Sequence, residues 1–196
     1  MENVTDLLLE SGAMLEGHFL LSSGCHSDRY FQCAKLLQYP QKAREVFQRV
    51  ASKIQDDIKN GILKTDLTAG PAVGGIIAAW ELGRQLGVPS IFTERDETGG
   101  MTLRRGFEIQ SGQHVLIVED VVTTGKSTME CAVALEKAGA VIAGLACIVD
   151  RRSRSCEPFP WPFYPAVKLE AGNWEASQCE LCKKGIAAVK PGSRKI

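Results

Sequence analysis

The stretch that decides the fold reads Val115-Leu116-Ile117-Val118-Glu119-Asp120-Val121-Val122-Thr123-Thr124-Gly125-Lys126-Ser127-Thr128. Its first four residues are all apolar, which predicts a strand covered on both faces, because polar alternation disappears when both faces are buried. Two adjacent acids, Glu119 and Asp120, follow that run and need hydroxyls, a cation or water as partners. The small residues after them predict a phosphate loop at the start of a helix over 127–138. The stretch therefore predicts a site for a phosphorylated ribose.

Two other interpretations of this stretch are open. Its end is similar to the nucleotide-binding loop G-x-x-x-x-G-K-[ST], but the position of the first glycine holds Asp120, so hydrolysis of ATP or GTP is disfavoured. Without a ligand, the threonines would serve as a helix N-cap and the acids as ordinary strand-end residues. The unbroken order of apolar run, acidic pair, Thr-Thr-Gly and Ser-Thr favours the phosphate site.

Helical and extended patterns alternate along the rest of the chain. Helices are expected over 4–11, from Pro40 onward and over 75–86, and strands near 66–69, 90–93 and 141–149. Residues 12–39 are expected to be irregular. The alternation predicts an α/β fold with a parallel sheet and covering helices. In such a sheet the segments around 70, 94, 120 and 150 meet at the carboxyl ends of the strands.

Composition limits the function classes. The chain has 196 residues, 44% of them hydrophobic, which favours one domain with a substantial core. Its net charge of +0 argues against a nucleic-acid partner. The amino terminus lacks a basic region, and the apolar run Leu7 to Leu9 is too short for a signal sequence. The weakly polar run 138–149 falls short of the roughly 20 residues of a membrane helix. With seven scattered cysteines, these features predict a cytoplasmic protein without a membrane segment.

The stretch 115–128 closely resembles the phosphoribosyl-pyrophosphate (PRPP) motif of type I phosphoribosyltransferases, an apolar run, two acids and T-x-G-x-[ST]. Within that superfamily the chain resembles the orotate-specific family in its segments 17–24, 70–72, 101–107 and 150–151. The resemblance implies the type I phosphoribosyltransferase fold over a single domain 1–196, with helices on both faces of the sheet. It also implies a small amino-terminal hood from about 1–39 and the carboxyl-terminal segment.

The implied reaction is transfer of ribose 5-phosphate from PRPP to orotate, giving orotidine 5′-monophosphate and pyrophosphate in UMP biosynthesis. Mg²⁺ is the implied cofactor, and no protein ligand is assigned to a metal. The resemblance implies a homodimer whose mobile loop, 93–106, completes the partner's site. A phosphoribosyltransferase for another base, or a PRPP-sensing regulator, is the alternative.

The resemblance assigns roles to particular residues. The catalytic residues are Glu119, Asp120, Arg95 and Arg104. Orotate is bound by Thr123, Arg151, Tyr30 and Phe31. PRPP is bound by Glu119, Asp120, Val121, Val122, Thr123, Thr124, Gly125, Lys126, Ser127 and Arg95. The family often has lysine at the positions of Ser22 and Gly74, and lysines and a histidine in the loop, where this chain has arginines.

Each flanking segment also has an interpretation without a ligand. The glycine-rich run 70–75 is also typical of an ordinary tight turn. The loop 93–106 is compatible with a solvated β-hairpin with 101–105 as a strand. Tyr30 and Phe31 are equally compatible with core packing, and Arg152 and Arg154 with a solvated basic loop.

The spacing of Cys179 and Cys182 is that of half a zinc site or a redox pair. A second pair of ligands is not evident, because Cys156 is isolated and His18, His26 and His114 are dispersed. Plain thiols are therefore the favoured interpretation.

Overall fold

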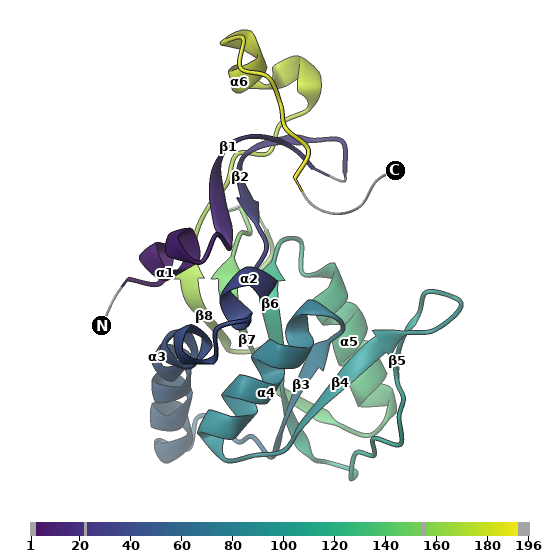
Figure 1. The fold of residues 1–196 in the computed structure, drawn as a ribbon. Helices are drawn as coiled ribbons and strands as arrows, with labels where there is room; N and C mark the ends of the chain where they lie inside the picture. Colours follow the sequence, from purple (N-terminus) through teal and green to yellow (C-terminus); the bar gives the residue numbers. More distant parts are fainter. Residues whose placement is uncertain (1–2, 22, 154–155, 192–196) are drawn as a thin grey trace.

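The computed structural model describes residues 3–21, 23–153 and 156–191. A central six-stranded sheet has the order β5-β4-β3-β6-β7-β8 (Figure 1). Its strands are β3 (Leu67–Pro71), β4 (Ser90–Arg95), β5 (Met101–Leu103), β6 (His114–Val122), β7 (Val141–Asp150) and β8 (Phe163–Lys168). The pairs are parallel except for β5, which runs antiparallel to β4. The predicted α/β fold with a parallel sheet is therefore confirmed.

Helices cover both faces of this sheet. One face carries α1 (Val4–Glu10), α2 (Ala34–Leu37), α3 (Pro40–Lys59) and α4 (Gly74–Leu86), and the other carries α5 (Lys126–Lys137). Helix α3 begins at Pro40, as its pattern predicts, because a first-turn proline lacks only an N–H that has no helical partner.

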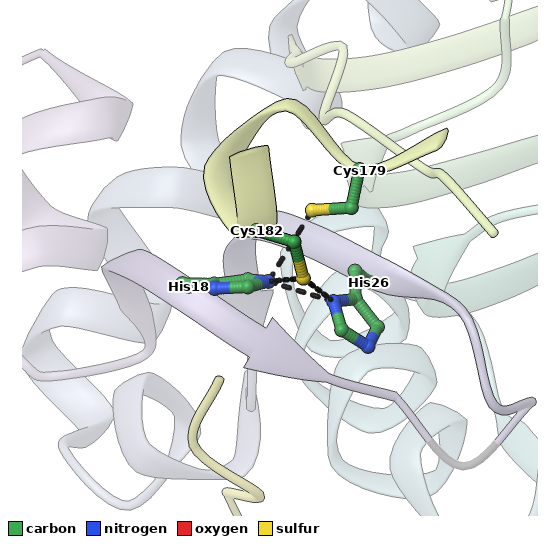
Figure 2. A group of neighbouring side chains, drawn as sticks. All are labelled: His18, His26, Cys179 and Cys182. Carbon is green, nitrogen blue, oxygen red and sulfur yellow. Dashed lines mark hydrogen bonds between the residues drawn. The ribbon is translucent and has the colours of Figure 1, made fainter. Parts of the chain in front are cut away.

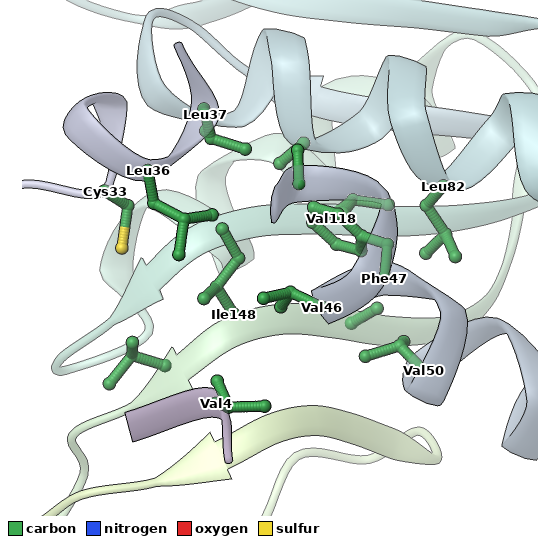
Figure 3. Packing of buried hydrophobic residues seen from close by; sticks show 14 of the residues in the cluster. Val4, Cys33, Leu36, Leu37, Val46, Phe47, Val50, Leu82, Val118 and Ile148 are labelled. Carbon is green, nitrogen blue, oxygen red and sulfur yellow. The ribbon is translucent and has the colours of Figure 1, made fainter. Parts of the chain in front are cut away.

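Strand β6 shows why the decisive stretch lacks alternation. Leu116 and Val118 belong to the core cluster that contains Phe47 of α3, whereas Val115 and Ile117 belong to the cluster around α5 (Figure 3). All four strand residues are fully buried. Both faces of the strand are thus apolar, and the acidic pair follows these residues toward the carboxyl end of β6.

A two-stranded hairpin stands beyond the carboxyl ends of the sheet strands (Figure 1). It consists of β1 (Met14–Leu20) and β2 (His26–Phe31), paired antiparallel. The prediction that 12–39 is irregular is therefore wrong. The register shifts between Glu16 and Phe19, and this bulge breaks the alternation from which a strand would be predicted.

The carboxyl-terminal segment joins that hairpin. Val189 bridges to Phe19, and Trp174 bridges to His26. Between them lie a short 3₁₀ helix, η1 (Ala176–Gln178), and α6 (Glu180–Lys183). The hairpin also brings His18 and His26 together, with ring centroids 4.8 Å apart, so these histidines are not dispersed in the fold as their sequence positions indicate.

Within the described ranges, none of the helices combines the length and apolar character that a bilayer crossing requires. Two residues of the sequence analysis, Ser22 and Arg154, lie outside the described residues.

Candidate active site

The acidic pair lies at the end of β6, and its surroundings oppose ionisation. Glu119 is only 7% exposed. Burial, and after it the neighbouring Asp120 carboxylate, raises the pKa of Glu119 to about 8. Burial also raises the pKa of Asp120, although Asp120 Oδ1 accepts a hydrogen bond of 2.8 Å from the backbone N–H of Val121. Ligand hydroxyls or a cation would relieve this cost.

The predicted phosphate loop connects β6 to α5. Gly125 has φ 79° and precedes the first helical residue, Lys126, so the chain turns sharply and leaves the helix N-terminus open. The backbone N–H of Lys126 donates to Thr124 Oγ1 at 3.3 Å. A small cavity of about 60 Å³ lies here, lined by Glu119, Val121, Val122, Thr123, Thr124, Gly125, Lys126, Ser127 and Thr128. The structure therefore brings the predicted PRPP residues of this stretch around one cavity, with Arg95 and Asp120 outside its lining.

The glycine-rich turn between β3 and α4 meets the acidic pair. A Cβ atom on Gly74 would lie 2.5 Å from Asp120 Oδ2, and one on Gly75 would lie 2.8 Å from the carbonyl oxygen of Val118. The peptide bond between Ala72 and Val73 is cis. Glycine at position 75 thus lets α4 start close to the backbone of β6, and at position 74 any larger residue would require the Asp120 carboxylate to move.

The loop arginines lie on a hairpin formed by β4 and β5, in which Glu94 pairs with Thr102. Arg95 donates to Glu130 of α5 and to the carbonyl oxygen of Gly99. Arg105 makes two hydrogen bonds to Glu94, of 3.0 and 2.9 Å. Arg104 Nε lies 3.9 Å from Glu94 Oε1. The hairpin alternative for this segment therefore describes its structure, with the strand limited to 101–103.

Arg151 follows β7, and its backbone N–H donates to the carbonyl oxygen of Val122 at 2.8 Å, at the end of β6. Its guanidinium carbon is 4.8 Å from the centroid of the Phe31 ring. Burial lowers the pKa of Arg151, whereas the charge of Asp28 and that of Cys33 act in the opposite direction. Burial, and after it the Asp120 carboxylate, raises the pKa of the Cys33 thiol. Arg151 Nε is buried and has no hydrogen-bond partner among the described residues. This half-buried cation thus offers a donor to an anionic ligand.

The two aromatic residues predicted to contact the base leave β2 on opposite faces, because neighbouring strand residues alternate. Phe31 faces Arg151, whereas the Tyr30 ring lies 6.0 Å from that of Phe19. Phe31 is therefore the aromatic side chain next to the half-buried cation.

Residues 40–168 match the family model described as "Phosphoribosyl transferase domain". The chain belongs to the phosphoribosyltransferase family. A curated relative, the orotate phosphoribosyltransferase of Acidithiobacillus ferrooxidans, is 47% identical over 193 residues, which are 98% of this chain and 97% of that protein.

Solved phosphoribosyltransferase structures share the fold. The orotate phosphoribosyltransferase of Aeropyrum pernix superposes with a TM-score of 0.69 at 22% identity, covering 85% of this chain and 93% of that one. A UMP synthase of Leishmania donovani has the same TM-score at 25% identity, but the match covers only 36% of that chain. The type I phosphoribosyltransferase fold is therefore confirmed.

The sequence of this phosphoribosyltransferase does not predict that the ring of Phe159 packs against the phosphate loop. A Cβ atom on Gly125 would lie 2.8 Å from the Phe159 ring, so this ring packs on the loop. The guanidinium carbon of Arg152 lies 4.2 Å from the centroid of the same ring, and Arg152 Nε lies 3.1 Å from Asp150 Oδ1. The solvated-loop interpretation is wrong for Arg152, whose side chain is 13% exposed. No local pattern links residues 150–152 to Phe159.

Proposed function

We propose that this chain is an orotate phosphoribosyltransferase, which transfers ribose 5-phosphate from PRPP to a ring nitrogen of orotate and releases pyrophosphate in UMP biosynthesis. The observation that carries the proposal is the buried Nε of Arg151, which has no partner among the described residues, on a residue whose backbone N–H donates to the carbonyl oxygen of Val122 in the phosphate-loop cavity. The orotate-specific relative at 47% identity supports the choice of acceptor. A cytoplasmic location stays a prediction.

In this proposal PRPP lies along the end of β6. Residues 123–127 bind its phosphate through backbone N–H groups and hydroxyls at the start of α5, where the helix dipole favours an anion. Glu119 and Asp120 accept hydrogen bonds from the ribose diol. Because burial raises the pKa of both acids, partners that stabilise the carboxylates add binding energy here.

The donor set also fits Mg²⁺, which prefers carboxylate, hydroxyl, phosphate and water oxygens. Two neighbouring carboxylates supply such oxygens at the end of β6, and the high pKa of Glu119 indicates that a nearby cation would favour its charged form. Glu119 and Asp120 would hold the ion directly or through water. When bound, Mg²⁺ would neutralise negative charge that develops on the departing pyrophosphate.

The acceptor site in the proposal lies between Arg151, Phe31 and Thr123. Orotate is a flat ring with a carboxylate, and a guanidinium presents parallel N–H donors that match a carboxylate. The guanidinium carbon lies over the Phe31 ring, 4.8 Å from its centroid, a cation–π contact that does not use the N–H donors of Arg151. Thr123 is exposed at the mouth of the loop and offers a hydroxyl. Tyr30 stays a predicted contact.

For the leaving pyrophosphate we assign Arg104 among the loop arginines. Arg105 already makes two hydrogen bonds to Glu94, and Arg95 holds Glu130. Arg104 lies 3.9 Å from Glu94, and its side chain is 55% exposed, so it moves toward an anion at small cost. Arg95 keeps the loop base close to α5. No protein nucleophile is needed, because positioning and charge stabilise the oxocarbenium-like transition state.

The proposal includes a homodimer with a shared site. Figure 1 shows the β4–β5 hairpin projecting from the sheet edge, away from the hairpin β1–β2 of its own chain. A loop in this position is suited to reach the site of a second copy related by two-fold symmetry.

The test mixes purified protein with PRPP, Mg²⁺ and orotate and follows the loss of orotate absorbance. Arg151→Ala is expected to raise the KM for orotate by roughly 10- to 100-fold, the cost of hydrogen bonds to a charged group. Asp120→Asn is expected to impair use of PRPP. Arg44→Ala, which removes an exposed arginine from α3, is the matched control and should retain activity.

Turnover with another base but not with orotate would discard the acceptor and keep the PRPP site. Binding of PRPP without turnover of any base would favour the regulator. Equal losses in Arg44→Ala and Arg151→Ala would remove the role assigned to Arg151.

A further inference from the structure

Four potential metal ligands converge between the β1–β2 hairpin and the carboxyl-terminal segment (Figure 2). They are His18 Nε2, His26 Nδ1, Cys179 Sγ and Cys182 Sγ, and all four atoms lie within 4.8 Å of one another. His18, His26 and Cys179 are buried, and Cys182 reaches the surface. The group is remote in sequence from the acidic pair and takes no part in the proposed transfer.

The hydrogen bonds of His18 present a lone pair to this cluster. His18 Nδ1 lies 2.7 Å from the carbonyl oxygen of Ile186, which can only accept, so Nδ1 carries the hydrogen. In the neutral ring, Nε2 is then unprotonated and faces the two sulfurs and His26. Metal-bound histidines are typically held in this way, by donation from the second ring nitrogen to a carbonyl or carboxylate.

Hydrogen bonds among the four side chains cannot satisfy all of their donors. His18 Nε2 has His26 Nδ1 at 2.7 Å and Cys179 Sγ at 3.3 Å, while Cys182 Sγ lies 3.3 Å from His26 Nδ1. With neutral thiols, a ring N–H and two S–H groups would compete for one imidazole lone pair. A cation that accepts electron pairs from all four atoms removes this competition.

The spacing and chemistry of the four atoms select the metal. With Zn–N of about 2.05 Å and Zn–S of about 2.3 Å, a tetrahedral site separates its ligand atoms by roughly 3.3–3.8 Å. The two S···N contacts of 3.3 Å lie at this spacing, and the N···N contact of 2.7 Å is shorter. Two thiolates and two imidazoles are a preferred ligand set of Zn²⁺, and four protein ligands make a closed, structural site.

The segment that carries the two cysteines has little secondary structure or packing of its own to hold it against the hairpin. Helix α6 has four residues and η1 has three, too few to be stable alone, and neither buries a side chain. A cavity of about 320 Å³, lined by His18, Leu181 and Ile186 among others, lies between parts of this segment and the hairpin. Apolar packing between the two parts is therefore incomplete.

We propose that His18, His26, Cys179 and Cys182 bind one structural Zn²⁺ that fastens the carboxyl-terminal segment to the β1–β2 hairpin. On binding, the two thiols release their protons to solvent, and the two thiolates balance the charge of the ion. The same hairpin carries Phe31 beside Arg151. The ion thus holds the hairpin that covers the acceptor site. The proposal does not depend on the identity of the acceptor.

The first test measures metal in the full chain, purified under reducing conditions with zinc present and without chelator. Elemental analysis should find about one Zn²⁺ per chain, and Cys182→Ser should lower this to roughly a tenth or less, since structural sites need all four ligands. Cys156→Ser is the matched control, because Cys156 is an exposed cysteine outside the cluster. It should retain full zinc.

A second measurement identifies the ligands. Co²⁺ bound in place of Zn²⁺ should give thiolate-to-metal charge-transfer and tetrahedral ligand-field bands in the parent chain and in Cys156→Ser. These bands should be lost in Cys182→Ser, whose fold is checked by circular dichroism. Chelation should expose the segment after Glu175 to protease.

Three results would overturn the proposal. They are a reduced, folded chain that holds no stoichiometric metal, equal metal content in Cys182→Ser and the parent, and a disulfide between Cys179 and Cys182 in protein without metal. The last result would identify the pair as a redox couple.

Discussion

At the scale of single residues, Glu119 makes the stability of the ligand-free protein depend on pH. Its pKa is raised from the ordinary 4.5 to about 8, first by burial and then by Asp120. Between these values the unfolded chain is ionised at this position and the folded chain is not. The contribution of Glu119 to the free energy of unfolding is therefore fully present below about pH 4.5 and is lost as pH rises toward 8.

We predict that Glu119→Gln removes this loss, because glutamine resembles the neutral acid. The free energy of unfolding of the variant, minus that of the parent, should increase by a few kcal/mol between pH 5 and 8, since one pKa unit corresponds to about 1.36 kcal/mol. Urea unfolding without Mg²⁺ or PRPP measures it. Glu108→Gln changes the same charge on an exposed side chain and serves as control. Parallel curves for parent and Glu119→Gln would contradict the prediction.

The neighbouring arginines show what a sequence can predict about single residues. Arg151 could be selected because it directly follows a predicted strand and resembles a family position. The role of Arg152 could not, because it depends on two rings, of Phe159 and Phe163, that only the fold brings over its guanidinium. The metal-ligand set was hidden for the same reason, since the bulged hairpin and the tail join His18 to Cys179.

At the scale of elements, the turn from β3 into α4 sets the position of the acidic pair. We predict that Gly74→Ala raises the KM for PRPP by roughly 10- to 100-fold, because the new Cβ would lie 2.5 Å from Asp120 Oδ2 and the carboxylate must move. Alanine suits a helix start, so the melting temperature should change little. Steady-state kinetics with varied PRPP measure the effect.

The matched control is Ile77→Ala, one turn further along α4, where the side chain is 48% exposed. Its KM for PRPP should equal that of the parent. A normal KM in Gly74→Ala would mean that Asp120 does not contact the diol in its present position.

The burial pattern of each helix or strand decides whether its sequence predicts it. Strand β6 and helix α3 were predicted because burial repeats regularly along them, on both faces of the strand and on one stripe of the helix. The edge strand β8 was not predicted, since it contains Pro165, which removes a ladder donor and is tolerated at an edge. Strand β5 is three residues long, too short to show a period, so the sequence supports a strand over 101–105 only as one of two interpretations.

At the scale of the whole molecule, the proposed dimer predicts that two variants, each inactive by itself, form active sites when they are mixed. If the loop of one protomer completes the site of its partner, then Arg104→Ala, which removes the residue assigned to the pyrophosphate, and Asp120→Asn each inactivate both sites of their own homodimer. A mixed dimer would contain one site with both intact residues and one with neither.

Mixing the two variants under conditions of subunit exchange should therefore restore about a quarter of parental activity, since half of the dimers are mixed and each has one working site. Native mass spectrometry would measure the exchange. The control replaces Arg104→Ala by the double variant Arg104→Ala/Asp120→Asn, whose mixed dimers with Asp120→Asn contain no intact site. If mixed dimers form but activity does not return, Arg104 acts within its own chain, whose hairpin Arg95 already holds against α5 through Glu130.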